Sequence, residues 1–332
     1  MELDLTRNVA VTAIGGYLPE EVLDNAYFER ILDTTDQWIR EHSGVRERRK
    51  LPENEATSDL AVRAAKEALA SRGIEPTELG MIIVATVTPD HLFPSTGNLV
   101  QAKLGARDVP SYDILAACSG FLYAFAQGYA FVRSGLYDKV LVIGAEAMTR
   151  ITNYADRSYC FLFGDAAAAV LLEPSDEPGI IALHLGSDGS KGSILIQKTG
   201  GSKYPLTEER VRNKEHLVSM EGHQVFKHAV RRMAKASDIA LEKSGWTKDD
   251  VDWFFAHQAN IRIVDSTVKH LKLDKAKNYV TIDYVGNTTA ASIPYGMYDA
   301  YKKGKLKKGD KVLLSAFGGG FTWASATLVW TI

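Results

Sequence analysis

The feature that most constrains this chain is a repeated order of short apolar runs, helical patterns and turns. Residues 59–88 pass through a helical pattern and Gly73 into an apolar run, and residues 225–258 pass through a helical pattern and Gly245 into another. Such alternation predicts an α/β fold in which helices cover both faces of the sheets. Two matched blocks in one order indicate an internal duplication, with chance similarity between generic strand–helix units as the alternative.

A second pair of blocks extends the match. Cys118 precedes a predicted helix and lies 21 positions before Lys139, where an apolar run begins. Asn287 also precedes a predicted helix and lies 24 positions before Lys311, where the corresponding run begins. Because equivalent turns of duplicated halves face each other across a pseudo-twofold axis, we expect Cys118 and Asn287 to meet at one site.

The duplication predicts where the chain divides. Segment 173–178 is acidic, contains two prolines and separates the matched blocks, so it is the expected seam. We therefore predict an N-terminal half, residues 1–175, that contains the cysteine. A C-terminal half, residues 176–332, contains the histidine and asparagine considered below.

Charge and composition narrow the class of protein. Lys and Arg total 39 against 41 Asp and Glu, a net charge of −2, which argues against the basic field of a nucleic-acid-binding protein. The uncharged stretches 114–132 and 312–332 are long enough for a membrane helix, but glycine-containing turns interrupt both, so we expect core elements and no membrane contact. Two cysteines provide neither a disulfide scaffold nor a cysteine zinc site, and they favour a reducing, cytoplasmic setting.

Cys118 is the first candidate for chemistry. It follows a predicted strand and stands at the start of an apolar helix, in the run Ala-Ala-Cys-Ser-Gly-Phe. A helix N-terminus offers partial positive charge, and such settings lower a thiol pKa from about 8.5 into the range ~3.5–7.5. We therefore expect a nucleophile with a lowered pKa, although an inert core cysteine fits the local sequence equally well. Cys160 lacks that context and is expected in the core.

Three further motifs lie at comparable positions. His257 follows a predicted strand, where it can donate a hydrogen bond to a carbonyl group or act as a base, and Asn287 precedes a helix, which it can merely cap. The run 317–321, Phe-Gly-Gly-Gly-Phe, allows a backbone N–H to approach a substrate oxygen without a Cβ in the way. Each signal is weak alone. A cysteine, a histidine and an asparagine at strand-to-helix turns of both halves together predict one site.

At these motifs the sequence closely resembles the β-ketoacyl-acyl carrier protein synthase III family of the thiolase-like superfamily. The resemblance extends over nearly the whole chain, and a cysteine, HQAN and GN[TS]xAAS in this order form its specific signature. Further matching runs are Thr-Asp-Gln-Trp-Ile at 35–39, Ser-Gly-Val-Arg-Glu-Arg at 43–48, Phe-Pro-Ser at 93–95, Asp-Arg at 156–157 and Phe-Gly-Asp at 163–165. The resemblance implies a thiolase-like fold, with a duplicated αβαβα layered architecture and two mixed five-stranded sheets.

The resemblance also implies a two-step condensation. Cys118 would attack an acyl-CoA thioester and retain the acyl group. Malonyl-acyl carrier protein would follow, and His257 and Asn287 would hydrogen-bond its thioester carbonyl while CO2 leaves. The N–H groups of Cys118 and Gly319 would form the oxyanion hole. CoA enters as part of the substrate, so neither a metal nor a redox cofactor is expected.

The implied function is the initiation of fatty acid synthesis, and two alternatives stay open. A related Cys-His-Asn condensing enzyme of polyketide or quinolone type would use a different starter or extender. A duplicated scaffold or acyl-CoA-binding protein without activity would require the three site residues to coincide by chance.

By the same resemblance, Trp38 and Arg157 would hold the adenine of CoA between them, by stacking and cation–π contact. The acyl pocket would be lined by Met148, Phe163, Phe317 and, from the partner subunit of a homodimer, Phe93. Docking of the acidic carrier protein would involve exposed cations, for which the alternative is simple solvated charge: Lys227, Arg262 and Lys269.

Four positions depart from the family pattern. Ser158 stands where a glycine is common, and Tyr159 follows it. Ala166 replaces a usual glycine, and His42 stands where many members have a basic residue that touches CoA. These departures leave the cysteine, histidine and asparagine untouched. We therefore expect this chain to differ from the family pattern in its acyl pocket and CoA contacts, and not in its three site residues.

Overall fold

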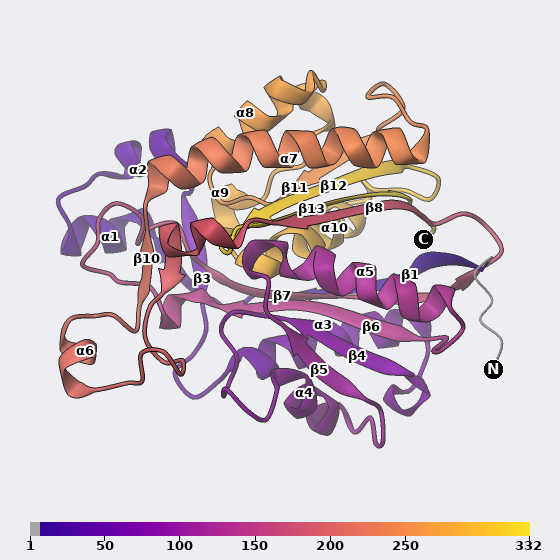
Figure 1. The fold of residues 1–332 in the computed structure, drawn as a ribbon, viewed down its shortest axis with the longest axis horizontal. Coiled ribbons are helices and arrows are strands. Elements are labelled where there is room, and N and C mark those ends of the chain that lie inside the picture. Colours follow the sequence, from indigo (N-terminus) through magenta and orange to yellow (C-terminus); the bar gives the residue numbers. More distant parts are fainter. Residues whose placement is uncertain (1–6) are drawn as a thin grey trace.

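A computed structural model of the chain describes residues 7–332, in which two large sheets alternate with layers of helix (Figure 1). The strands are β1 (Asn8–Tyr17), β2 (Glu21–Asp24), β3 (Glu47–Lys50), β4 (Met81–Ala85), β5 (Ser111–Ile114), β6 (Val140–Ala147), β7 (Asp165–Ser175), β8 (Ile180–Ser187), β9 (Leu195–Gln197), β10 (Val218–Met220), β11 (Trp253–Ala256), β12 (Lys311–Gly318) and β13 (Thr322–Val329). The α-helices are α1 (Asn25–Ile31), α2 (Asp36–Ser43), α3 (Thr57–Arg72), α4 (Thr96–Leu104), α5 (Gly120–Arg133), α6 (Glu208–Arg212), α7 (Gly222–Ser244), α8 (Ile261–Leu271), α9 (Ile282–Val285) and α10 (Ser292–Lys302).

The first large sheet has the strand order β1-β7-β6-β4-β5. β4 pairs in parallel with both β5 and β6, while β7 runs antiparallel between β6 and β1. Every residue of β4 and β6 is buried, as expected for strands that helices cover on both faces. The mixed pairing and the covered faces agree with the α/β class that the alternating pattern predicts.

The second large sheet has the order β8-β13-β12-β11, which repeats the order and directions of β1, β7, β6 and β4. The prediction of five strands in each sheet is wrong for this one, which has four. In place of a fifth strand, a single bridge joins Phe254 to Asn278. After this bridge, the N–H groups of Thr281 and Ile282 each donate to the side chain of Gln258 over 2.9 Å.

The helices form the three remaining layers (Figure 1). α5 and α10 lie between the two large sheets, α3 and α4 cover the outer face of the first sheet, and α7 and α8 cover the outer face of the second. α3 and α7 end in the same way, at Gly73 and Gly245, whose left-handed φ angles are 71° and 70°. This is the αβαβα layering that the resemblance implied. The boundary at residue 175 stays a prediction, although β7 ends at Ser175 and β8 begins at Ile180.

Small residues bring the middle layer close to the first sheet. A Cβ on Gly144 of β6 would lie 2.4 Å from the carbonyl oxygen of Ala290, so a side chain there would displace the turn before α10. Ala166 has no exposed surface and packs with Val285 and Ala291 beside the same turn. The departure at Ala166 therefore affects packing between the sheet and the turn before α10.

Shorter elements gather at the end of the molecule opposite the C-terminus (Figure 1). They are the ribbon of β2 and β3, the ribbon of β9 and β10, and helices α1, α2 and α6. Within residues 7–332, no helix combines the length and the apolar character that crossing a membrane requires.

Candidate active site

Cys118 lies in the 3-10 turn η2 (Ala117–Ser119), directly before α5. Ala117 has a φ of 47°, in the left-handed region that residues other than glycine rarely adopt. Gly318 at the end of β12 packs against this turn, where a Cβ would lie only 2.6 Å from the backbone nitrogen of Cys118. The glycine run therefore allows β12 to reach the turn, and the Cys118 side chain stays partly exposed beside it.

The turn before α10 repeats this geometry. The 3-10 turn η6 (Thr289–Ala291) directly precedes α10, and Thr289 has a φ of 50°. The structural counterpart of Cys118 is therefore Ala290, and not Asn287 as the sequence comparison predicted. Counted from Ala290, the next strand begins after 21 positions, close to the 22 positions that separate Cys118 from its own next strand.

His257 and Asn287 are almost fully buried, with 2% and 4% of their surface exposed. His257 follows β11, and its N–H donates to the carbonyl oxygen of Ser315 in β12 over 2.8 Å. Asn287 precedes η6, and its side-chain oxygen accepts the N–H of Thr289 over 3.0 Å. Within residues 7–332, neither ring nitrogen of His257 has a hydrogen-bond partner. Such a buried polar group is available to a bound molecule, so a catalytic role for the pair stays a prediction.

Burial dominates the electrostatics of the site. It raises the pKa of the Cys118 thiol to about 12, and the charge of Glu146 adds to the rise, while the nearby Thr289 hydroxyl acts in the opposite direction. The predicted lowering of this pKa by a helix N-terminus is therefore wrong, because burial outweighs it. Burial lowers the pKa of His257 to about 3, so its ring is neutral near pH 7. Burial also raises the pKa of Cys160 to about 11, so the two cysteines differ in access and not in pKa.

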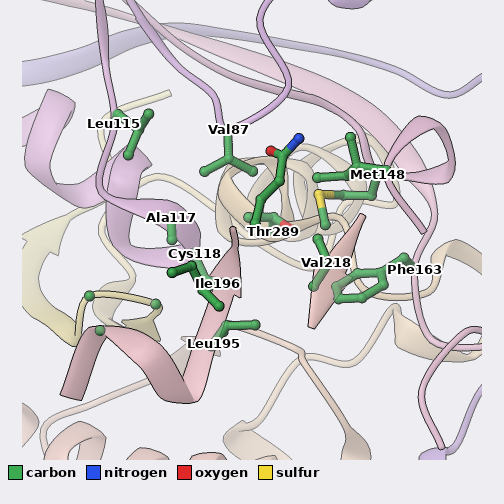
Figure 2. A pocket seen from close by; sticks show the side chains of 15 residues that line it. Val87, Leu115, Ala117, Cys118, Met148, Phe163, Leu195, Ile196, Val218 and Thr289 are labelled. Atoms are coloured by element: carbon green, nitrogen blue, oxygen red, sulfur yellow. The ribbon is translucent and has the colours of Figure 1, made fainter. Parts of the chain in front are cut away.

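Cys118 opens into a cavity of ≈ 350 Å³ that is mostly apolar (Figure 2). Met148 and Phe163 line the side away from Cys118, as the resemblance implied, and Gly319 lines it as well. Sequence reasoning missed the other lining residues, which are Val87, Leu115, Ala117, Ile151, Gly192, Leu195, Ile196, Gln197, Val218, Thr289 and Gly320. Four of these belong to β9 and β10, strands of three residues that are too short for their periodicity to reveal them.

Of the two other phenylalanines that the resemblance assigned to the acyl pocket, Phe317 does not line the cavity, and Phe93 was expected to enter it from a partner subunit. Phe317 is only 3% exposed and packs against Phe321, with ring centroids 4.7 Å apart, in the core beneath α7 and α8. Its assignment to the pocket is corrected accordingly. Phe93, in contrast, is 86% exposed on the loop between β4 and α4, beside the equally exposed Leu92. A role for Phe93 across a subunit interface stays a prediction.

The structure brings the two predicted CoA contacts together. The guanidinium carbon of Arg157 lies 5.7 Å from the centroid of the Trp38 ring, and Phe161 meets that ring edge-on. His42 stacks on Trp38 with ring centroids 4.2 Å apart and planes inclined by 17°. The departure at His42 therefore covers one face of the indole. Arg157 also pairs with the exposed Asp33 over 3.5 Å, a contact that stabilises little.

The departures at Ser158 and Tyr159 have different surroundings. The exposed Ser158 hydroxyl donates to Asp156 over 2.6 Å. Tyr159 is fully buried, donates its hydroxyl to the carbonyl oxygen of Val218 and meets the ring of Phe163 at 6.0 Å. Tyr159 therefore supports two lining residues of the cavity from behind.

The predicted docking cations lie on the outer face of the second sheet, on two helices that pack together. Lys227 on α7 and both Arg262 and Lys269 on α8 are exposed. None of the three pairs with an acidic residue of the part of the chain that the structure describes. In that same part, no three His, Cys, Asp or Glu side chains cluster in a way that could hold a metal ion.

The layered fold, with a cysteine at the junction of its two halves, defines a thiolase-like condensing enzyme. Family models described as 3-oxoacyl-[acyl-carrier-protein] synthase III and its C-terminal part match residues 112–189 and 241–330. A β-ketoacyl-[acyl-carrier-protein] synthase III of Clostridioides difficile is 45% identical over 99% of this chain and 100% of its own length. That of Caldanaerobacter subterraneus is 46% identical over 97% of both chains.

Solved structures agree with these matches. The 3-oxoacyl-[acyl-carrier-protein] synthase III of Aquifex aeolicus superposes with a TM-score of 0.90 and 40% identity, over 97% of this chain and 100% of that one. The priming β-ketosynthase of the R1128 polyketide pathway gives a TM-score of 0.91 and 32% identity, over 98% and 97%. This chain therefore belongs to the 3-oxoacyl-[acyl-carrier-protein] synthase III family, whose members are acyltransferases.

Proposed function

We propose that the chain acts as a β-ketoacyl-acyl carrier protein synthase III, which condenses an acyl-CoA starter with malonyl-acyl carrier protein and so initiates fatty acid synthesis. The observation that most directly supports this is the position of Cys118, whose side chain opens into an apolar cavity beside the glycine run. A thiol at the wall of an apolar cavity suits the covalent capture of an acyl chain.

In the first half-reaction, the Cys118 sulfur forms a bond to the acyl carbonyl carbon and the bond from that carbon to the CoA sulfur breaks. The thiol proton ends on the departing CoA sulfur. Because the pKa of the thiol is about 12, thiolate is scarce near pH 7, so the proton must leave Cys118 as the new bond forms. The N–H groups of Cys118 and Gly319, which both line the cavity, are proposed to bind the oxyanion.

In the second half-reaction, malonyl-acyl carrier protein loses CO2, and the electron pair of the broken C–C bond forms an enolate. His257 and Asn287 are proposed to donate hydrogen bonds to the thioester oxygen, where negative charge develops. A neutral His257 can donate an N–H without itself changing charge. The enolate carbon then attacks the acyl group, the bond to Cys118 breaks, and its sulfur takes up a proton from solvent. Neither a metal nor a redox cofactor takes part in these steps.

The remaining substrate contacts follow from position. Trp38 and Arg157 are proposed to bind the adenine of CoA, on the face of the indole that His42 leaves open. Met148 and Phe163, which lie across the cavity from the thiol, are proposed to contact the acyl chain. An acyl group on Cys118 would thus extend away from the glycine run and into the apolar part of the cavity.

Two exposed surfaces suit protein partners. The cations Lys227, Arg262 and Lys269 are proposed to dock the acidic carrier protein. Phe93 and Leu92, 86% and 81% exposed, are large apolar side chains that suit a subunit interface, so we propose a homodimer. We further propose a cytoplasmic location, with neither nucleic acid nor membrane as a partner.

A second candidate follows from the likeness to the priming β-ketosynthase of a polyketide pathway. One assay separates the two: a panel of acyl-CoAs is offered with malonyl-acyl carrier protein, and the 3-oxoacyl product is measured by mass spectrometry. Efficient formation of 3-oxoacyl-acyl carrier protein from short acyl-CoAs supports the proposed function. Refusal of malonyl-acyl carrier protein, with turnover of another extender, supports the second candidate instead.

A further inference from the structure

Glu146, one residue before the end of β6, is a buried carboxyl group beside the nucleophile that the proposed reaction does not use. Its side chain has no exposed surface, and only hydrogen bonds offset its burial. A buried carboxyl group without a cationic partner lowers the stability of the fold, so its presence beside the thiol points to a functional role.

The carboxyl group of Glu146 joins two segments that flank Cys118. From the loop after β4, the Thr86 hydroxyl, the Val87 N–H and the Thr88 hydroxyl donate to it over 3.2, 3.1 and 2.8 Å. The turn η6 packs against β6, and the nearby Ala290 N–H lowers the pKa of Glu146. The first segment provides Val87 to the wall of the cavity, and the second is the structural counterpart of the nucleophile turn. One side chain thus holds the first segment by hydrogen bonds and lies beside the second.

The same group acts on Cys118 through its charge. Burial raises the pKa of Glu146 to about 8, although its hydrogen bonds act in the opposite direction, so its negative charge appears as the pH rises through about 8. That charge raises the pKa of the Cys118 thiol further, because a thiolate beside a carboxylate is unfavourable.

Among the described residues, the hydrogen-bond partners of the Glu146 carboxyl group are uncharged, and the buried carboxyl group of Asp165, next to Ala166 on β7, accepts hydrogen bonds from Leu51 and Thr149. The loop after β4 and the turn η6 contribute hydroxyl and N–H groups, and β7 places Ala166 opposite Glu146. The remaining titratable group of the site, His257, is neutral above about pH 3. Among the described residues, Glu146 is therefore the charge that acts on the Cys118 thiol, and its effect adds to the larger effect of burial.

We propose that Glu146 is a positioning residue of the condensation, which clamps the loop after β4 and the turn η6 around Cys118 and, when ionised, holds Cys118 in its thiol form. This inference rests on the proposed function for its catalytic meaning. Its electrostatic part needs no substrate and is tested separately.

The electrostatic test measures alkylation of Cys118 by iodoacetamide from pH 6 to pH 10, in a Cys160→Ala background where no other thiol reacts. At pH 6, where Glu146 is protonated, Glu146→Gln should react at the parent rate. At pH 9 it should react roughly tenfold faster than the parent, the effect of about one pKa unit on the thiolate fraction. Glu146→Asp keeps the charge and should follow the parent profile. The matched control is Glu173→Gln, at the far end of β7, where a buried carboxylate pairs with Arg72 over 2.7 Å; it should leave the profile unchanged.

The clamp is tested by Thr88→Val, which removes one donor to the carboxyl group and the acceptor of the Ala147 N–H. We expect its kcat for acyl transfer to fall several-fold, while KM for acyl-CoA and alkylation at pH 6, where Glu146 is protonated in both proteins, stay near the parent values. Equal alkylation of the parent and Glu146→Gln at pH 9, or equal acceleration by Glu146→Asp, would overturn the electrostatic part. An unchanged kcat in Thr88→Val would overturn the clamp. Failure of every acyl-CoA to label Cys118 would contradict the proposed function and leave the alkylation comparison intact.

Discussion

The turns before α5 and α10 have nearly the same backbone conformation but present different side chains. Each is a 3-10 turn that begins with a residue of positive φ, 47° at Ala117 and 50° at Thr289, and each directly precedes a helix of the middle layer. The first presents Cys118 to an apolar cavity, whereas the second has Ala290 at the same place, with only 1% of its surface exposed.

The comparison teaches how a duplicated fold can produce one asymmetric site. Both halves have such a turn, but only the N-terminal turn presents a thiol to the cavity. The C-terminal half contributes His257 after β11, the glycine run at the end of β12 and Asn287 just before its own turn. A symmetric scaffold therefore places the proposed nucleophile in one half and the proposed hydrogen-bond donors in the other.

The largest effect is expected from removing the nucleophile. Cys118→Ala should lower condensation by roughly 10³-fold or more, because no covalent acyl intermediate can form. The double variant Cys118→Ala/Ala290→Cys moves the thiol to the equivalent turn and should stay inactive, because Ala290 does not line the cavity. Steady-state condensation rates measure both. Recovered activity in the double variant would show that the two turns are interchangeable and break the comparison.

A smaller loss is expected from the donors of the C-terminal half. His257→Ala and Asn287→Ala should each slow decarboxylation of malonyl-acyl carrier protein by about 10²–10³-fold, the effect of losing one donor to a developing oxyanion. The acyl-enzyme on Cys118 should still form, because acylation needs neither side chain as a donor. Rapid-quench mass spectrometry separates these half-reactions. Loss of acylation in either variant would contradict the division of labour between the halves.

The close approach of β12 to the nucleophile turn gives a prediction about packing. Gly318→Ala places a Cβ 2.6 Å from the backbone nitrogen of Cys118, so it should lower the free energy of unfolding by about 1–3 kcal/mol and reduce acylation several-fold. Gly222→Ala is the matched control, since a Cβ there has nothing within 4 Å. Chemical denaturation checks both variants. A Gly318→Ala variant as stable and active as the control would show that the turn tolerates displacement.

The smallest effect concerns the neutral histidine of the C-terminal half. Burial lowers the pKa of His257 to about 3 in the folded chain. As the pH falls below 6.5, the unfolded chain therefore protonates this histidine while the folded chain keeps it neutral. This contribution to stability is present above pH 6.5 and is lost as the pH falls towards 3. Between pH 6.5 and pH 5.5, His257→Gln should therefore lose about 1 kcal/mol less stability than the wild type. Equal losses of unfolding free energy in the wild type and in His257→Gln would mean that His257 is protonated in the folded chain.

The alternation of apolar runs and helical patterns was sufficient to predict the class, the duplication and the glycine-terminated helices α3 and α7. It failed where a tertiary contact decides the outcome. The expected fifth strand of the second sheet is replaced by a single bridge at Asn278, after which the N–H groups of Thr281 and Ile282 donate to the side chain of Gln258. The sequence comparison paired Cys118 with Asn287, three residues before its structural counterpart Ala290, because Asn287 is polar and Ala290 is not. The spacing of 21 positions from Ala290 to Lys311 was nevertheless present in the sequence.

Within the site, sequence reasoning found the residues with recognisable motifs and missed those without them. Met148 and Phe163 line the cavity at Cys118, whereas Phe317 packs in the core, and contact of the first two with an acyl chain stays a prediction. The pKa of Cys118 was misjudged because it depends on burial, which arises from β12 and the turn η6 and leaves no mark near the cysteine in the sequence. Glu146 also had no signal of its own, since it looks like one acidic residue at the end of an apolar strand.

The central claim is that one of two equivalent turns holds the acyl group, and peptide mapping tests it most directly. The full chain is incubated with acetyl-, branched and longer acyl-CoAs, digested, and searched by mass spectrometry for the acyl adduct. The account predicts one adduct per chain, on Cys118, with none on Cys160 and none in Cys118→Ala. An adduct on Cys160, or a Cys118→Ala variant that still accumulates acyl-protein, would contradict it.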